Sequence, residues 1–191
     1  MPYLIAGLIL FLGLHSVRIF ADGWRTAQIA RLGDKGWKLL YTLVSLIGFG
    51  LILWGFHLAR QDPVVLWPRI AGMHHAAAPL MVLAFILLAA AYVPGNHLKA
   101  KFGHPMVLSV KTWSFAHLLV NNTLADVLLF GSFLIWAVVA YISLRRRDRA
   151  AGVVPRPGTL QGTVLTVIVG AVAAIVFAHW AHAWLFGVSP F

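Results

Sequence analysis

Cysteine and glutamate are both absent from this chain of 191 residues. Without cysteine the protein has no disulfides, no thiolate metal sites, no iron–sulfur cluster and no covalently attached haem. Five aspartates are the only acidic side chains, which excludes carboxylate-rich di-iron sites and catalysis by paired carboxylates. Any cofactor must therefore be held non-covalently, and histidine, which occurs nine times, is the ligand that the composition favours.

Charge of either sign is scarce. Charged residues make up 10% of the chain and hydrophobic residues 61%, whereas soluble domains carry about a quarter charged residues. Several apolar runs approach the roughly 20 residues needed to cross a hydrocarbon core. The net charge of +10 comes mainly from segments between these runs, so membrane topology explains it better than nucleic-acid binding. We expect residues 1–191 to form a single membrane domain.

The apolar runs predict an all-α fold, a polytopic bundle of about six transmembrane helices. The first run lacks a basic segment before it and a small-residue cleavage site after it, so we interpret it as a retained helix. The predicted helices cover residues 2–18, 38–59, 73–94, 105–121, 124–144 and 159–187.

Basic residues set the expected orientation. They concentrate after the first, third and fifth predicted helices, between Arg18 and Lys38, at Lys99 and Lys101, and between Arg145 and Arg156. Because basic loops stay in the cytoplasm, both termini are predicted on the non-cytoplasmic side. A five-helix alternative with a re-entrant segment 105–121 would place basic loops on opposite sides, so six spans are preferred.

Two histidines within predicted spans are candidate metal ligands. Ionisable groups in hydrocarbon are costly and by default mark a site. His15 lies one turn before Arg18, and this pairing suits an axial ligand beside a cation for a haem propionate. His117 shares a helix face with Asn121, and either Asn121 or Ser114 would orient its imidazole. For both histidines the alternative is a structural hydrogen bond between helices.

The other histidines are weaker candidates. His104 precedes Pro105 at a helix start, where it would bind an anionic group of a cofactor together with Lys101, or simply cap the helix. His179 and His182 share a face and would suit a metal, although histidines near a membrane surface are more often solvated or hydrogen-bonded. His57, His74 and His75 are placed near the same surface.

Three segments carry a resemblance to the NnrU family of bacterial membrane proteins. They are Gly13-Leu14-His15-Ser16-Val17-Arg18, then His104-Pro105-Met106 with Trp113-x-x-Ala116-His117, and finally Trp184-Leu185-Phe186-Gly187-Val188-Ser189-Pro190. The family is associated with denitrification and nitric oxide metabolism, and is similar to plant zeta-carotene isomerase, an integral membrane haem b enzyme with histidine ligands. The resemblance implies a bacterial inner-membrane protein with non-covalent haem b, His15 and His117 as iron ligands, and Arg18 and His104 near the cofactor.

The expected depths leave other ligand pairs open. At about 1.5 Å per helical residue, His15 lies roughly 5–10 Å from the cytoplasmic edge and His117 roughly 20 Å. The alternatives are His15 with His104, or His117 with His75 or His182.

Four functional hypotheses follow. The first is a haem b protein of nitrogen-oxide or membrane redox chemistry, in which two axial histidines favour electron transfer over gas binding. The second is an isomerase-like haem enzyme acting on a polyene or lipid. The third, a methyltransferase-like protein, is disfavoured because acidic residues for a cofactor ribose are missing. The fourth is a cofactor-free accessory protein of a respiratory or denitrification complex. Besides the lipid bilayer, the partners expected are a hydrophobic small molecule or such respiratory proteins.

Overall fold

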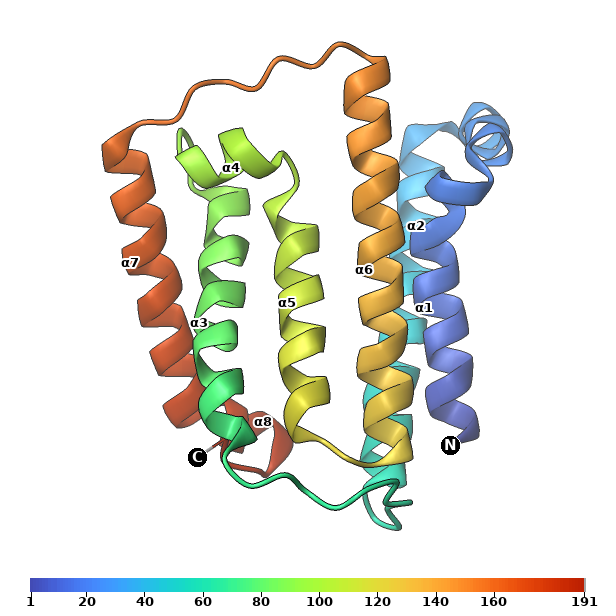
Figure 1. Cartoon of the computed structure of the whole chain (residues 1–191). Coiled ribbons are helices and arrows are strands. Elements are labelled where there is room, and N and C mark those ends of the chain that lie inside the picture. The colour runs from blue at the N-terminus through green and yellow to red at the C-terminus, as the bar shows by residue number, and fades with distance from the viewer. Residues whose placement is uncertain (191) are drawn as a thin grey trace. The chain divides into compact units, whose positions relative to one another are not determined.

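Helices form most of the structure, a computed structural model that describes residues 1–190 (Figure 1). Within this range there is no β-strand, only two isolated bridges. The helices are α1 (Pro2–Phe20), α2 (Asp22–Ala59), α3 (Met73–Tyr92), α4 (His97–Phe102), α5 (Pro105–Val120), α6 (Leu124–Ala150), α7 (Leu160–Val176), the π-helix η1 (Phe177–Ala181) and α8 (His182–Phe186). The predicted all-α fold is confirmed, and each of the six predicted segments is helical.

Five helical segments of residues 1–190 are long and apolar enough to cross a membrane. They are α1, α2, α3, α6 and the continuous stretch Leu160–Phe186. α5 has 16 residues, just under the roughly 17 of the shortest spanning helices. Large apolar side chains remain exposed on these helices, for example Ile9 on α1 and Ile168 on α7, and in water such faces would be unfavourable. The chain is therefore a multi-pass membrane protein whose exposed apolar faces contact lipid.

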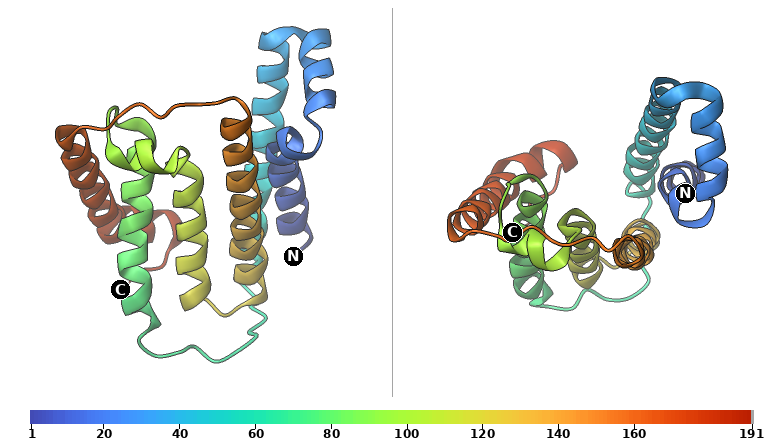
Figure 2. Two further views of the ribbon diagram at one scale, coloured as in Figure 1. Left: turned by 45° about the horizontal axis from the view of Figure 1, so that its top comes forward. Right: turned by 90° about the horizontal axis from the view of Figure 1, so that it is seen from above.

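The segment predicted as a basic loop, residues 19–37, is mostly helical instead, with Ala21 separating α1 from α2. α2 begins at Asp22 and is interrupted only at Gly33, where φ is 70° and ψ is 164°. Alanine, glutamine and arginine in residues 22–32 favour helix, and a helix also satisfies the backbone groups near the bilayer. In Figure 2 the first part of α2 (blue) runs in a different direction from the remainder (cyan).

Other helix ends also differ from the predicted ones. α6 continues to Ala150 rather than ending near residue 144, because arginines are good helix formers and interact favourably with a helix C-terminus. The predicted loop after α3 contains the short helix α4, whose N-cap Asn96 accepts a hydrogen bond from the backbone N–H of Lys99 at 2.7 Å. α7 continues into η1, where the helix widens for one π turn.

The chain divides into two compact units. The first comprises Met1–Pro68 and Asn122–Trp136, and the second Arg69–Asn121 and Ala137–Phe191, of which the structure describes residues up to 190. The prediction of a single domain stays a prediction.

In the first unit, glycines bring α1 and α2 into close contact. A Cβ added at Gly7 would lie 2.6 Å from the backbone nitrogen of Ile52, and one at Gly48 would lie 2.9 Å from that of Phe11. At Gly55 an added Cβ would overlap the backbone of Leu4. Small residues at such positions let membrane helices pack backbone to backbone.

In the second unit, α3 packs against both α5 and α7 (Figure 1). An added Cβ at Gly170 would overlap the backbone of Ile86, so α7 also approaches α3 at a glycine. The hydroxyl of Ser109 on α5 donates a hydrogen bond to the carbonyl of Ala84 on α3 at 2.7 Å. These contacts place α5, which carries His117, against the apolar helix α3.

Candidate functional site

His15 lies among aromatic side chains of the first unit. Its ring stacks on Phe11 with centroids 4.2 Å apart, and the rings of Tyr41 and Trp136 lie 5.3 and 6.2 Å away. Phe11 in turn contacts Phe49 and Phe133. Helices α1, α2 and α6 therefore surround this imidazole with rings, as the four-residue spacing of Phe11 and His15 on one helix face allows.

A backbone carbonyl selects the tautomer of His15. The Nδ1 atom lies 2.6 Å from the carbonyl oxygen of Phe11, which can only accept a hydrogen bond. Nδ1 must therefore carry the proton, and the lone pair is left on Nε2. This is the arrangement in which a neutral histidine binds a metal through one nitrogen while the other nitrogen is held by a hydrogen bond.

Two buried polar atoms in the same unit have no hydrogen-bond partner. They are the hydroxyl oxygen of Ser45 and the indole nitrogen of Trp136. Ser45 is four residues from both Tyr41 and Phe49, the α2 rings that contact His15 and Phe11. Unsatisfied buried donors are uncommon, and each one calls for an explanation such as a bound group or a water. Trp136 is also one of the rings beside His15.

His117 shows the same tautomer on α5 in the second unit. Its Nδ1 lies 3.0 Å from the carbonyl oxygen of Trp113, and the two rings are in contact at 5.3 Å. The prediction that Asn121 or Ser114 orients the imidazole is wrong. The Asn121 amide donates to the backbone carbonyl of His117, and the Ser114 hydroxyl is buried without a partner. A carbonyl one turn back competes more effectively because it is always within reach in a helix.

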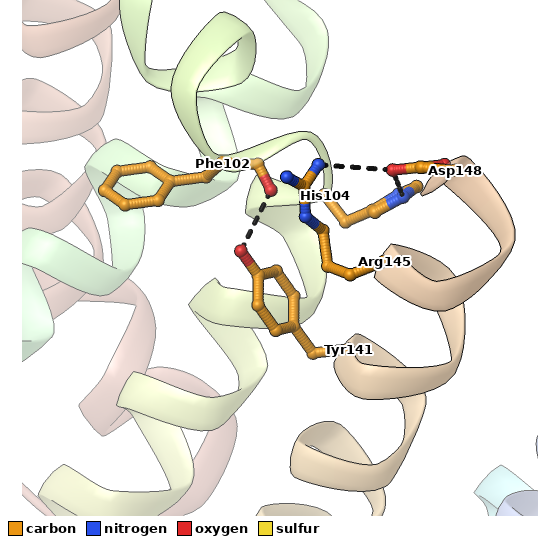
Figure 3. Close-up of polar contacts among 5 residues, drawn as sticks. All are labelled: Phe102, His104, Tyr141, Arg145 and Asp148. Carbon is orange, nitrogen blue, oxygen red and sulfur yellow. Dashed lines mark hydrogen bonds and ion pairs between the residues drawn. The ribbon is translucent and has the colours of Figure 1, made fainter. Parts of the chain in front are cut away.

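His104 is the N-cap residue of α5 and belongs to a charged cluster (Figure 3). Its Nε2 lies 2.9 Å from Oδ2 of Asp148, and Nη1 of Arg145 lies 3.3 Å from the same oxygen. One turn earlier on α6, the hydroxyl of Tyr141 donates to the carbonyl of Phe102 at 3.0 Å. The cluster joins the turn between α4 and α5 to the C-terminal part of α6.

The sequence interpretation missed Asp148 and Arg145 as partners of His104. Asp148 is the one acidic residue in the run Arg145-Arg146-Arg147-Asp148-Arg149. A single aspartate within a basic run is the sequence feature that could have indicated a partner for His104. Gly103 completes the turn with φ of 74°, and a Cβ there would lie 2.8 Å from Nη1 of Arg145. The predicted role of His104 toward a cofactor stays a prediction, since the structure shows its Nε2 engaged by Asp148.

The remaining histidines make structural contacts. His97 contacts the hydroxyl of Thr163 through Nδ1 at 2.7 Å, and His57 contacts Gln61 at 3.2 Å. His179 and His182 bond through Nδ1 to the carbonyls of Ile175 and Val188. The rings of His74 and His75 lie against each other. Within residues 1–190, no group of three or more histidine or acidic side chains lies close enough together to hold a metal ion.

The residues around His15 fit a haem in three respects. Nε2 carries the free lone pair, the neighbours are aromatic and apolar, and Arg18 follows one turn later in the last turn of α1. His15 belongs to the first unit, whereas His117 and His104 belong to the second. Binding of one iron by both His15 and His117 stays a prediction.

The helices and their exposed apolar faces define a multi-pass α-helical membrane protein with histidines inside its helices. The family model described as NnrU protein matches residues 3–190, nearly the whole length. The chain therefore belongs to the NnrU family, as the sequence motifs predicted. Neither the curated proteins nor the solved structures contain a match to it.

Proposed function

We propose that this NnrU-family protein binds haem b within the membrane, with His15 as an axial ligand, and acts in membrane redox or nitrogen-oxide chemistry. The observation that supports the proposal is the hydrogen bond between Nδ1 of His15 and the carbonyl of Phe11. It leaves the ligating nitrogen deprotonated and fixes the ring plane, as the outer hydrogen bond of a metal-bound histidine does.

The side chains around His15 would hold the rest of the cofactor. Bound haem supplies reversible one-electron chemistry at its iron. The rings of Phe11, Tyr41 and Trp136 partly shield His15 from solvent and offer flat apolar surfaces against a macrocycle. Arg18 provides a cation for a propionate near the end of α1. The unpartnered donor of Trp136 is available to a polar group of the cofactor.

His117 is the proposed second ligand. Its Nδ1 is bonded to a backbone carbonyl, as in His15, so that the other nitrogen is the one suited to iron. If both histidines hold the haem, the chemistry expected is electron transfer, or chemistry gated by release of one histidine, rather than simple gas binding.

The test is an absorption spectrum of the detergent-purified protein, oxidised and dithionite-reduced. We expect a Soret band with sharp α and β bands on reduction. His15→Ala should lose the haem, and His117→Ala should either lose it or show a five-coordinate spectrum. His179→Ala is the matched control, because His179 also bonds through Nδ1 to the carbonyl four residues earlier in its helix, and it should leave the spectrum unchanged.

Two results would contradict the proposal. A spectrum unaltered by both His15→Ala and His117→Ala would reject these ligands. A protein that stays colourless when produced with excess haem would reject haem binding and favour the role of an accessory protein.

A further inference from the structure

The first part of α2 plays no role in the proposed haem binding. Residues 22–32 form a helix that ends where Gly33 takes φ of 70°. This helix and the three residues after it, residues 22–35, are here called the basic arm. A Cβ at Gly33 would have nothing within 4 Å, so the backbone angle rather than crowding requires glycine there. In Figure 2 the arm leaves the end of α1 and returns to the rest of α2.

The arm and the residues next to it are strongly basic. From Arg18 to Lys38 there are five basic side chains and two aspartates, a net charge of +3. Arg31 and Lys35 are exposed. One aspartate, Asp22, faces Arg25 at a distance of 3.7 Å, with its own side chain 54% exposed, so this pair offsets little of the surrounding field.

Exposed aromatic residues accompany this charge. Phe20, just before the arm, is 77% exposed, and Trp24 within it is 54% exposed. Trp24 and Arg31 are seven residues apart and so lie on one helix face. The rings of Trp24 and Trp37 also meet edge to face, with centroids 6.1 Å apart, and this contact holds the arm against the next part of α2. Tryptophan beside arginine on an exposed helix is typical of the membrane–water interface.

We propose that the basic arm lies on the membrane surface and binds anionic phospholipid headgroups. Arg31 and Lys35 contact the phosphates, and Phe20 and Trp24 enter the interface. The net charge of +3 carried by residues 18–38, in and beside the arm, is complementary to such lipids. Its position supports the same occupant, because it directly joins α1 to the apolar part of α2, two segments that cross the bilayer, and therefore lies within reach of the headgroups at that end.

The absence of cysteine allows a direct test. Ala27→Cys adds a single thiol on an exposed position of the arm, to which a nitroxide is attached. The protein is reconstituted in nanodiscs of phosphatidylcholine, with phosphatidylglycerol replacing it stepwise, and label mobility and accessibility are read by electron paramagnetic resonance. We expect the label to become immobilised and to move toward the headgroups as phosphatidylglycerol increases.

Removing the charge should remove this response. Each basic side chain lost weakens attraction to an anionic surface about fivefold, so Arg31→Gln with Lys35→Gln should abolish the shift. The control pair, Lys101→Gln with Arg156→Gln, removes the same charge outside the arm and should keep it. An equal loss in the control pair, or the same shift with inorganic phosphate in phosphatidylcholine discs, would overturn the proposal.

Salt provides a second measurement that needs no substitution on the arm. The Debye length falls from about 10 Å at 0.1 M salt to about 3 Å at 1 M, so the shift of the label should disappear at high salt. Persistence of the shift at 1 M salt would reject headgroup binding by charge, even if the double variant fails to fold. Neither test depends on haem.

Discussion

His104 and Arg145 both contact one carboxylate oxygen of Asp148. The exposure of these side chains determines how much the contact adds to the stability of the fold. The side chains of His104 and Asp148 are 27% and 22% exposed, so solvent screens their attraction only in part. A fully exposed ion pair contributes almost nothing to stability, whereas a half-buried one with good geometry contributes measurably. The contact therefore stabilises the turn between α4 and α5 to a modest extent.

A double-mutant cycle measures this contribution. For His104→Ala and Asp148→Ala we expect a coupling of about 0.5–1 kcal/mol in the free energy of unfolding, measured by denaturant titration in a mild detergent. The control cycle uses Arg25→Ala and Asp22→Ala, whose contact is longer and more exposed, and its coupling should be about 0–0.3 kcal/mol. Equal coupling energies in the two cycles would show that burial of the His104–Asp148 pair does not increase its contribution to stability.

Asp126 illustrates how an intramembrane carboxylate can be structural. It is the one acidic residue within a predicted span, and such a residue by default marks a functional site. In the structure its Oδ2 accepts hydrogen bonds from the backbone N–H and the hydroxyl of Thr123, at 3.1 and 2.6 Å. The N–H of Asp126 lies 3.3 Å from that hydroxyl in return. This reciprocal arrangement is a capping box at the start of α6.

At the scale of elements, glycine decides how closely helices approach. α1 and α2 meet at Gly7, Gly48 and Gly55, which face the backbone of the other helix. Membrane helices gain little from the hydrophobic effect between them, so close packing is a main source of their association. Loss of one contact glycine should separate the pair along much of its length.

Gly55→Ala tests this packing. The new Cβ would overlap the backbone of Leu4, which cannot rotate away, so α1 must shift, at a cost of about 2–3 kcal/mol or more in stability. Gly50→Ala is the matched control on the same helix, because its Cβ would have nothing within 4 Å, and it should be neutral or stabilise by up to about 1 kcal/mol. Thermal unfolding in detergent compares the two, and equal melting temperatures would contradict the role of Gly55.

At the scale of the whole molecule, the number of crossings determines which loops share a side of the membrane. α3, α5 and α6 lie between residue 65 and residue 154. If all three cross, these residues lie on opposite sides, and the positive-inside rule assigns Val154 to the cytoplasm. If α5 is re-entrant, they lie on the same side. Since α5 has only 16 residues, its crossing of the membrane is the part of the predicted topology that a test should address first.

Single thiols report the topology. Val65→Cys and Val154→Cys each introduce the only cysteine at a side chain that is 60% and 86% exposed, respectively. A membrane-impermeant maleimide should label Val154→Cys only in inside-out vesicles and Val65→Cys only in right-side-out vesicles. Labelling of both from one side would contradict three crossings, and exchange of the two patterns would reverse the predicted orientation.

The sequence by itself determined the class of protein and the approximate position of its six long apolar helices. Hydrophobic runs of spanning length are a local property, since a backbone in hydrocarbon must satisfy its own hydrogen bonds and a helix does so within one segment. The tautomer of His15 has a similarly local cause, because the carbonyl of Phe11 lies one turn back on the same helix. The NnrU motifs were also present in the sequence, and the family match confirms them.

Only the tertiary structure decided which distant side chains meet. The contact of His104 with Asp148 spans 44 residues, and the rings around His15 come from three helices. Helical periodicity states which residues share a face but not which face of another helix lies opposite. The helix of residues 22–32 was missed for a different reason, because the basic charge of this segment indicated a loop. Its helix-forming residues instead make a helix, and the positive φ of Gly33 joins that helix to the rest of α2 at an angle.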